Sequence, residues 1–299
     1  MKLREDLYFN MKFENTKVYG FYSALKGMRN PKESYNKSDT SYGIGFLDSV
    51  EKDKNKKILY KNTSFAEYIS IGPNDMKLAQ SLIKAGSEHR KFMRQIFVSV
   101  DITAPLYWWK EFDTYKVGTV ANSTSTMHKI ASKPITLDCF EIDDLTDINM
   151  SIPLVGMTET LEHCTNVIID FLEGLRQKYL ETKDKRFWKE LIRWLPESWL
   201  QTRTVTMTYE NLFAMCGCGQ RRFHKLNEWS GIDDNTLENF ISWARTLPYA
   251  QEFIFIDEIF TKDTTYKYEE IIEAINSLGQ TNTISIEDFK NALEKIKKL

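Results

Sequence analysis

The chain has 299 residues, 42% hydrophobic and 13% aromatic, which is enough to bury a sizeable core. Its 40 basic and 42 acidic residues give a formal net charge of −2, so the sequence lacks the excess of positive charge that is typical of proteins that bind duplex nucleic acid. No apolar run approaches the roughly 20 residues that span a bilayer, and the N-terminus lacks the apolar core of a secretory signal. We therefore expect a folded cytoplasmic protein that does not bind membranes.

The first predicted elements are a loop, a helix and a strand. The charge run at 50–57, "VEKDKNKK", is typical of a solvated loop. Pro73 near its start and Gly86 at its end bracket a predicted helix over 74–85. The letters "IFVSVDI" alternate and predict a strand over 96–102, which Ala104-Pro105 should interrupt before a helix begins at Tyr107.

The middle of the chain is mostly helical, with one extended run. The strongest predicted helix covers 158–183, and a second covers 186–195, before Pro196. The first has one apolar stripe, composed of Leu161, Cys164, Ile168, Phe171, Leu172, Leu175 and Tyr179. "QTRTVTMTY" is extended, "ENLFAM" begins another helix, and a further helix covers 237–247. These elements predict an α/β domain over 1–248 and a helical appendage over 249–299.

Two patterns that could indicate a metal do not satisfy the ligand requirements. Cys216-Gly-Cys218 has no second Cys/His pair at zinc spacing, so Cys139, Cys164 and this pair are interpreted as reduced thiols. The C-terminal two-helix rhythm is similar to an EF-hand, but Asp288 is the only carboxylate at the calcium positions. We expect no metal site.

Three clusters of polar residues are candidates for binding. Glu88 and His89 precede Arg90, Lys91 and Arg94, which is either a phosphate site or a solvated helix start. Residues 119–128, "TVANSTSTMH", are either a site for a polyoxygenated ligand or a loop of turn residues. The third cluster is a group of basic residues within 201–229, which either bind an anion or lie at helix ends, where positive charge is favourable. Its members are Arg203, Arg221, Arg222, His224 and Lys225.

The order of these clusters resembles the flavin-dependent thymidylate synthases (the ThyX family) over roughly residues 70–232. "EH..F" at 88–92, a strand, "AP" at 104–105 and a helix lead to "KVGTVANSTS"; Leu195-Pro196, "TVTMTYENL" and "QRRFHKLNEW" follow. The family signature is R-H-R-x-x-S-x-N-x-x-S-x-R. Here Lys116 alone keeps a positive charge from its R-H-R triplet, Thr119 stands for the first serine, Asn122 and Ser125 match after a one-residue insertion, and Met127 replaces the last arginine. In the later helix, Thr208 and Glu210 stand where the family has Asn and Arg, and either Gln220 or Arg221 corresponds to the arginine before the histidine, depending on where a one-residue insertion falls.

The resemblance implies a central, mostly antiparallel sheet flanked by helices, and a homotetramer with FAD sites between chains. It implies methylation of dUMP with methylenetetrahydrofolate, reduced FAD and NADPH, the flavin carrying the chemistry. The residues implied in FAD binding are Glu88, His89, Lys116, Thr119, Asn122 and His224, and those implied in substrate binding are Ser125 and Arg221. Because signature arginines are missing, the alternative is an inactive nucleotide-binding or regulatory protein; an unrelated α/β protein is the third hypothesis.

Overall fold

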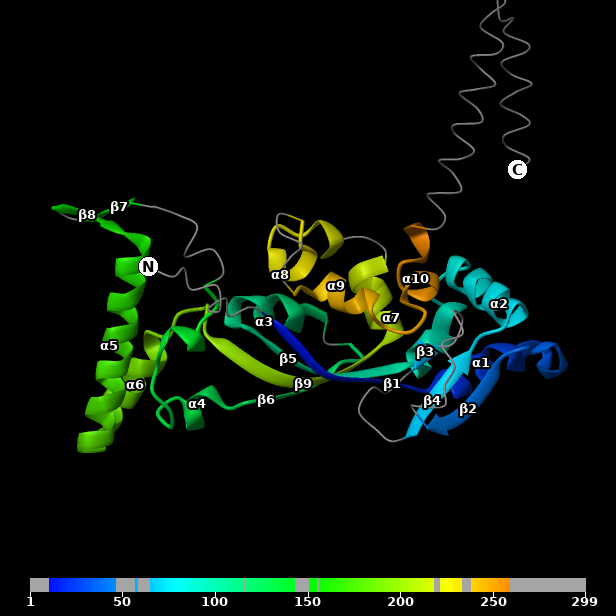
Figure 1. The fold of residues 1–299 in the computed structure, drawn as a ribbon, viewed down its shortest axis with the longest axis horizontal. Helices are drawn as coiled ribbons and strands as arrows, with labels where there is room; N and C mark the ends of the chain where they lie inside the picture. Colours follow the sequence, from blue (N-terminus) through cyan, green and yellow to red (C-terminus); the bar gives the residue numbers. More distant parts are fainter. Residues whose placement is uncertain are drawn as a thin grey trace, which may run out of the picture.

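A computed structural model describes residues 11–46, 57–58, 65–115, 117–142, 151–154, 156–217, 221–232 and 238–258. Its centre is an antiparallel four-stranded sheet with strand order β1-β5-β9-β6 (Figure 1). The strands are β1 (Lys12–Tyr19), β5 (Phe97–Pro105), β9 (Leu200–Thr208) and β6 (Val120–Ser123). Together with the helices around it, this sheet confirms the predicted α/β class.

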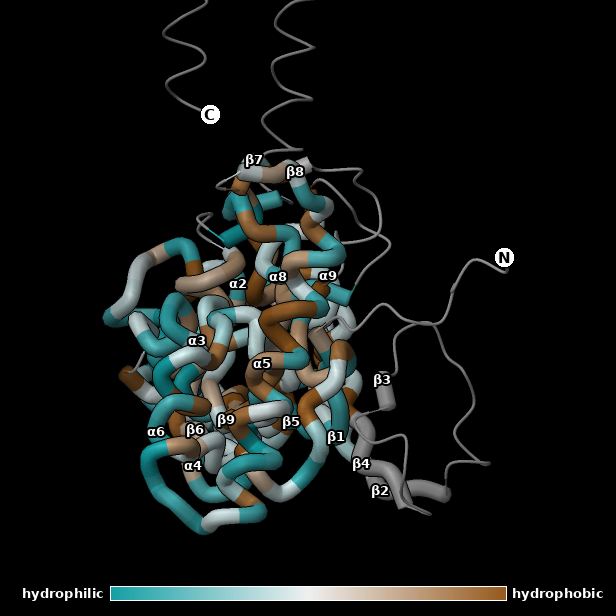
Figure 2. Tube along the Cα trace, turned by 90° about the vertical axis from the view of Figure 1, so that its left-hand side faces the viewer, coloured by the Kyte–Doolittle hydropathy of each residue, from teal (hydrophilic) through white to brown (hydrophobic). Residues whose placement is uncertain are grey.

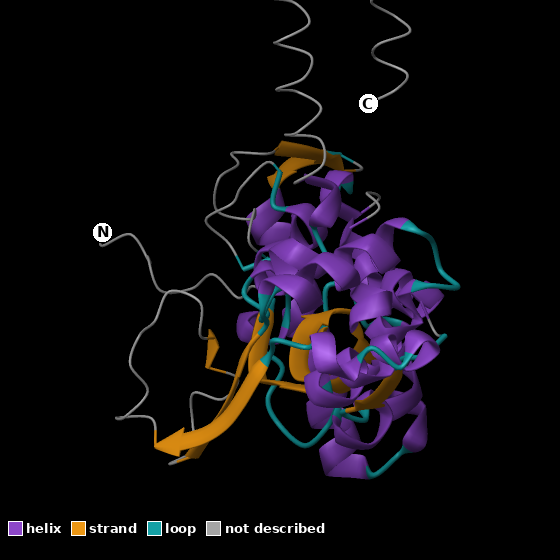
Figure 3. Cartoon of the chain, turned by 90° about the vertical axis from the view of Figure 1, so that its right-hand side faces the viewer, coloured by secondary structure: helices purple, strands orange, loops and turns teal. Residues whose placement is uncertain are grey.

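The two faces of the sheet differ in character because side chains alternate along each strand. On β5, Val98, Val100 and Ile102 are buried, whereas the intervening Ser99 and Asp101 are partly exposed. Helices gather on the apolar side (Figures 1 and 3). They are α1 (Phe21–Arg29), α2 (Pro73–Lys84), α3 (Leu106–Phe112), α7 (Tyr209–Leu212), α8 (Asn227–Ser230), α9 (Phe240–Arg245) and α10 (Ala250–Phe253).

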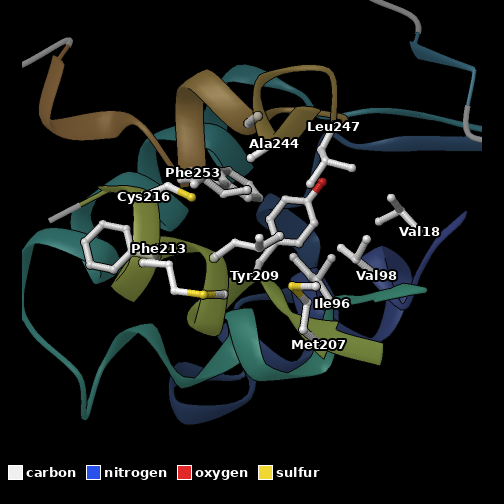
Figure 4. Packing of buried hydrophobic residues seen from close by; sticks show 14 of the residues in the cluster. Val18, Ile96, Val98, Met207, Tyr209, Phe213, Cys216, Ala244, Leu247 and Phe253 are labelled. Atoms are coloured by element: carbon white, nitrogen blue, oxygen red, sulfur yellow. The ribbon is translucent and has the colours of Figure 1, made fainter. Parts of the chain in front are cut away.

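Tyr209 lies in the main core that this packing creates (Figure 4). Its side chain is fully buried, and its hydroxyl donates a 2.6 Å hydrogen bond to the carbonyl of Pro248. Burial raises the pKa of this phenol well above its ordinary value. The bond satisfies the one polar group of the ring, so Tyr209 joins the start of α7 to the segment before α10.

A second, smaller core holds the end of the molecule that is opposite α1 and α2 in Figure 1. It lies between α5 (Leu161–Thr182), α6 (Lys185–Arg193) and the chain after α4 (Thr126–Lys129). Its buried members are Ile130, Ile135, Phe140, Ile169, Leu172 and Leu191. Glu173 on α5 binds Arg176 through two 2.7 Å contacts and accepts the Ile135 amide at 2.8 Å, which ties the helix to this core.

The remaining elements are short. Strands β2 (Ser41–Phe46), β4 (Phe65–Ser70) and β3 (Lys57–Ile58) form a separate sheet, and β7 (Ser151–Leu154) pairs with β8 (Met157–Thr160). The 3-10 helices are η1 (Asn30–Lys32), η2 (Tyr35–Lys37), η4 (Arg90–Gln95), η5 (Asp113–Tyr115), η6 (Leu137–Cys139) and η8 (Arg221–Phe223); a π-helix covers Phe213–Gly217. Within the described ranges, no helix has the length and apolarity needed to cross a membrane.

Most predicted helices are confirmed, with shifted ends. The helices predicted at 74–85, 158–183 and 186–195 are α2, α5 and α6, and the one predicted at 237–247 is shorter, as α9. The predicted break at Ala104-Pro105 is wrong, because both residues pair with β9 and β5 continues to Pro105, three residues beyond the predicted end. Lys57 begins β3; positions 50–56, Lys116, and the predicted helices and calcium loop within 259–299 lie outside the described residues.

Part of the predicted stripe of α5 is wrong. Leu172 is buried, as expected, but Ile168 and Phe171 are exposed. Instead, the helix buries Ile169 and Arg176 against the smaller core. The helix therefore packs on a face rotated from the one that periodicity predicts.

Candidate functional site

Arg221, at the start of η8, is held in place by two contacts with the segment α3–η5. Only 9% of the residue is exposed. Its Nε donates a 2.8 Å hydrogen bond to the hydroxyl of Tyr115, and its Nη2 pairs with the carboxylate of Glu111. The third nitrogen, Nη1, makes no hydrogen bond to the residues that the structure describes. Two of the three nitrogens thus fix the guanidinium and leave one to meet a ligand.

Aromatic rings form the surroundings of this guanidinium. Its central carbon lies 5.1 Å from the ring centroid of Tyr115 and 5.0 Å from that of Trp229, both within cation–π range. Trp229 is fully buried and stacks on Trp108 with a centroid separation of 4.5 Å. The site therefore has a rigid apolar wall, against which a charged group is poorly screened by water.

His224 lies beside this arginine and is electrostatically coupled to it. Its Nδ1 accepts a 3.1 Å hydrogen bond from the Leu226 amide, so the neutral ring carries its proton on Nε2. Burial, and then the charge of Arg221, lower the pKa of His224, while Glu111 acts in the opposite direction. The imidazole is thereby kept neutral near pH 7, with an N–H donor still available.

Arg221 and His224 together offer two N–H donors, with one carboxylate, Glu111, as the counter-charge. Donors of this kind suit a phosphate or carboxylate, because arginine binds such oxyanions through its planar fork. Glu111 is part-exposed, with 39% of its side chain accessible, so an incoming anion can compete with it without stranding a buried charge. The donors of this arrangement therefore suit an anionic ligand.

The segment 117–119 is pinned beside the same tyrosine. Thr119 Oγ1 donates a 3.0 Å hydrogen bond to the Tyr115 carbonyl, and Asn211 Nδ2 donates a 2.7 Å bond to the Val117 carbonyl. Gly118 between them has φ of +80°, a conformation that suits glycine. Thr119 thus bonds the backbone of Tyr115, whereas Arg221 bonds the hydroxyl of the same residue.

Asn122 belongs to the opposite face of the sheet. It pairs with Thr204, and Thr204 in turn pairs with Asp101 and donates to its carboxylate at 2.6 Å. Cross-strand neighbours carry their side chains on one face, and here it is the polar face, whereas α8 lies on the apolar side (Figure 1). Within one chain, Asn122 and His224 are therefore separated by the sheet.

Ser125 is engaged locally. Its hydroxyl accepts the His128 amide at 3.2 Å and lies 2.7 Å from Nδ1 of the same histidine, which caps α4. Residues 119–128 contain the edge strand β6 followed by this capped helical turn, so the prediction of a turn-rich loop is wrong, and the ligand site stays a prediction.

Glu88 and His89 are exposed just before η4, and both Arg90 and Arg94 in η4 form ion pairs with Glu210, the Arg90 pair being the shorter. Arg90 Nε lies 2.9 and 3.2 Å from the two oxygens of Glu210, the residue at the family's arginine position in the α7 segment. No hydrogen bond or ion pair links Glu88 or His89 to Thr119, Asn122 or His224 within the described chain. The first predicted cluster is thus separate from the Arg221 site.

Three residues of the site were not among the predicted site residues: Glu111, Tyr115 and Trp229. The signal for the first two was the helical spacing of four residues, which places Glu111 and Tyr115 on one side of the helix. Trp229 gave no local signal, because its contact with Arg221 depends on how η8 and α8 pack.

Comparison with known proteins gives structural neighbours only. No protein-family model matches, and no curated protein matches. Two crystal structures of ThyX from Helicobacter pylori with FAD and dUMP each have a TM-score of 0.49 and 13% identity, covering 83% of this chain and 98% or 97% of theirs. A UMP/dUMP methylase, PolB from Streptomyces cacaoi bound with 5-Br UMP, has a TM-score of 0.39 and 10% identity, covering 68% of this chain and 73% of its own.

Proposed function

We propose that the chain binds the phosphate of a uridine nucleotide at Arg221 and His224, and that it methylates dUMP with methylenetetrahydrofolate and reduced FAD. The observation that carries the proposal is the unused nitrogen of the fixed Arg221 fork beside the neutral His224 ring. It is supported by the sequence resemblance, which implied Arg221 in substrate binding and His224 in FAD binding. The two ThyX crystal structures among the structural neighbours contain FAD and dUMP.

The flavin assignment needs a surface shared between chains. The described candidates for its contacts do not fit a single-chain site, because Asn122 lies on the polar face, His224 on the apolar side, and Glu88 and His89 beside η4. When bound, the flavin would supply the hydride. The residues of this chain bind and orient the nucleotide.

A second function, nucleotide binding without turnover, is favoured by two ion pairs. Glu111 already neutralises Arg221, and Glu210 at a family arginine position pairs with Arg90. Both pairs occupy charges that a phosphate or flavin would otherwise meet. A protein of this kind would bind dUMP and remain colourless.

Ligand-induced stabilisation tests the phosphate site. Adding dUMP at 100 times its Kd should raise the unfolding free energy by about 2.7 kcal/mol, which a thermal shift detects. Arg221→Ala should remove this shift, and Arg193→Ala, which alters an exposed ion pair on α6, should keep it. Absence of any shift with saturating dUMP would contradict the proposal.

The visible spectrum separates the two functions. A protein that takes up FAD and then turns over dUMP in the presence of NADPH and methylenetetrahydrofolate supports the methylating enzyme. A preparation that stays colourless after FAD titration, yet is stabilised by dUMP, identifies the binding protein instead.

A further inference from the structure

The 3-10 helix η8 carries two neighbouring arginines that bind different parts of the molecule. Arg221 contacts the segment α3–η5, whereas Arg222 contacts the chain that follows α10. Arg222 Nη1 donates a 2.6 Å hydrogen bond to Glu258 Oε1, and Nη2 pairs with the carboxylate of Asp257. Nη2 also donates to the Gly217 carbonyl at 3.1 Å, and only 13% of the side chain is exposed. The two arginines therefore tie η8 to two separate segments.

Glu258 is shared between two arginines. Arg245, at the end of α9, donates from Nη2 to Oε1 at 2.6 Å and from Nη1 to Oε2 at 3.0 Å. The central carbon of Arg245 lies 4.1 Å from the ring centroid of the fully buried Phe255, which holds this guanidinium in place. We call Arg222, Arg245, Asp257 and Glu258 the η8 clamp. Helices α8, which follows η8, and α9, which holds Arg245, lie side by side in Figures 1 and 2.

The charges of the η8 clamp balance one another. Hydrogen bonds from Arg245, partly opposed by burial and reinforced by Arg222, lower the pKa of Glu258 to about 2, so this carboxylate is ionised at neutral pH. Two arginines then face two carboxylates. The clamp has no excess positive charge with which to attract an anion, so its role is to hold a geometry.

The backbone that leads into η8 also packs closely against the end of α10. A Cβ on Gly217 would lie 2.0 Å from the carbonyl oxygen of Ile254, so only glycine permits this approach. The π-helix that ends at Gly217 thus touches α10 through backbone atoms. Because the Gly217 carbonyl also accepts a hydrogen bond from Arg222, the same glycine takes part in both contacts.

Helix η8 is too short to fix its own position. Three residues close a single turn, in which the His224 amide donates to the Arg221 carbonyl at 3.3 Å. An anion that binds Arg221 also competes with Glu111, one of the hydrogen-bond partners of this arginine. Once Glu111 is displaced, the place of Arg221 depends on Tyr115 and on the backbone of η8. The η8 clamp holds that backbone.

We propose that Arg222, Asp257 and Glu258 are positioning residues for the nucleotide site, which hold η8 so that Arg221 and His224 meet the phosphate in a fixed geometry. The inference rests on the proposed function and extends the site to residues that do not contact the ligand. Donors that are held in place before binding lose less freedom when the ligand arrives, and this raises the affinity.

Titration calorimetry on the full chain tests the proposal through the sign of one effect. Glu258→Gln removes a negative charge beside η8, so electrostatics alone would tighten the binding of dUMP and of sulfate. Positioning predicts the reverse, because glutamine keeps the shape but loses the charge-assisted bonds to Arg222. Both ligands should bind about tenfold more weakly, within the usual range of coupling between sites. Glu111→Gln, which removes a negative charge from Arg221, should act in the opposite direction.

Glu173→Gln is the matched control. Glu173 also binds an arginine, which lowers its pKa to about 2, but it lies on α5, far from α10 in Figure 1. Its replacement should change the affinity for dUMP by less than about twofold, because distant sites act independently. Asp257→Asn leaves the Glu258 pair in place and should weaken binding less than Glu258→Gln does. It provides the test if Glu258→Gln does not fold.

The pKa of His224 gives a readout without ligand. Burial and the charge of Arg221 lower this pKa, so loosening η8 in Glu258→Gln should let it rise towards the ordinary value. Loss of a negative charge alone would lower it further, and NMR titration distinguishes the two directions. Binding as tight as that of the wild type in both Glu258→Gln and Asp257→Asn overturns the inference and leaves the proposed function intact. A wild-type protein that binds neither dUMP nor sulfate contradicts the proposed function and this inference together.

Discussion

Two buried arginines, Arg29 and Arg221, hold carboxylates in different ways. Every nitrogen of Arg29 is used: Nε donates to Asp75 at 2.6 Å, Nη1 to the Ser34 carbonyl at 3.2 Å and Nη2 to the Lys37 carbonyl at 3.1 Å. Arg221 uses two nitrogens, and its third makes no hydrogen bond to the described residues. The partners differ as well, because Asp75 is fully buried and Glu111 is part-exposed.

The Arg29–Asp75 pair has a structural role, because its hydrogen bonds are all made within the protein. Asp75 also accepts hydrogen bonds from the hydroxyls of Ser38 at 2.7 Å and Thr40 at 2.6 Å. All three guanidinium nitrogens of Arg29 are used, so the network joins α1, α2 and the segment before β2. The second site has spare donor capacity and a replaceable counter-ion. A buried arginine is therefore a better candidate for ligand binding when its hydrogen bonds are incomplete.

The largest expected effect comes from breaking the saturated pair. Asp75→Asn should lower the unfolding free energy by about 3–5 kcal/mol, because it leaves the Arg29 charge buried without its partner. Urea unfolding measures this. Glu190→Gln, which removes an exposed pair with Arg193, should change it by less than about 1 kcal/mol. Equal losses in both variants would show that burial does not distinguish the two pairs.

The pH dependence of stability also distinguishes Asp75→Asn from the wild-type protein. Burial opposes ionisation of Asp75, but hydrogen bonds from Thr40, Ser38 and Arg29 outweigh it and lower the pKa of this carboxyl. The stability that it contributes is present above the unfolded pKa near 3.8 and is lost as the pH falls through the lower folded value. The wild-type protein should therefore lose stability more steeply below pH 4 than Asp75→Asn does.

The second effect sharpens the other side of the comparison. Glu111→Gln should free Arg221 and tighten binding of sulfate or dUMP about tenfold, a change of about 1.4 kcal/mol. Isothermal titration measures the affinity, and unfolding should change by less than about 1 kcal/mol because Glu111 is part-exposed. Weaker binding would mean that Glu111 positions the arginine rather than competing for it.

Sequence predicted the framework of the molecule well where periodicity is strong. The ends of α2 follow from Pro73 and Gly86, and β9 follows from its alternating threonines. The class of sheet came from the resemblance and is confirmed by the pairing of β1, β5, β9 and β6. The face of α5 was mispredicted because periodicity identifies an apolar arc and not the neighbour that covers part of it.

The site could be predicted only in part. Arg221 and His224 were identified by their charge, although the choice between Arg221 and Gln220 depended on a one-residue insertion. The packing of Arg221 against Trp229 could not be predicted, because it depends on how η8 and α8 lie relative to each other. Asn122 and Ser125 matched the signature letter for letter, yet one lies on the polar sheet face and the other caps α4. A motif gives residue types; register and capping decide where the side chains go.

The third effect concerns that cap. Ser125→Ala should lower the unfolding free energy by about 1 kcal/mol, since the His128 amide loses its acceptor. If capping is the whole role of Ser125, dUMP affinity should stay within about twofold of wild type. Chemical unfolding and titration on the same sample measure both. Intact stability with much weaker dUMP binding would place Ser125 in the substrate site instead.

The smallest effect is the titration of His224, which tests whether the Arg221 site receives anions. Its pKa should lie below the ordinary 6.5, because burial and Arg221 disfavour the charged ring. Between the folded and unfolded pKa values the unfolded chain binds more protons, so this residue's contribution to stability rises with pH and is complete above about 6.5. Sulfate does not titrate near neutral pH, and its bound charge should raise the His224 pKa in NMR titrations. The His163 signal on distant α5 should not respond to sulfate. A His224 pKa unmoved by saturating sulfate would place the anion elsewhere and return Arg221 to the same structural role as Arg29.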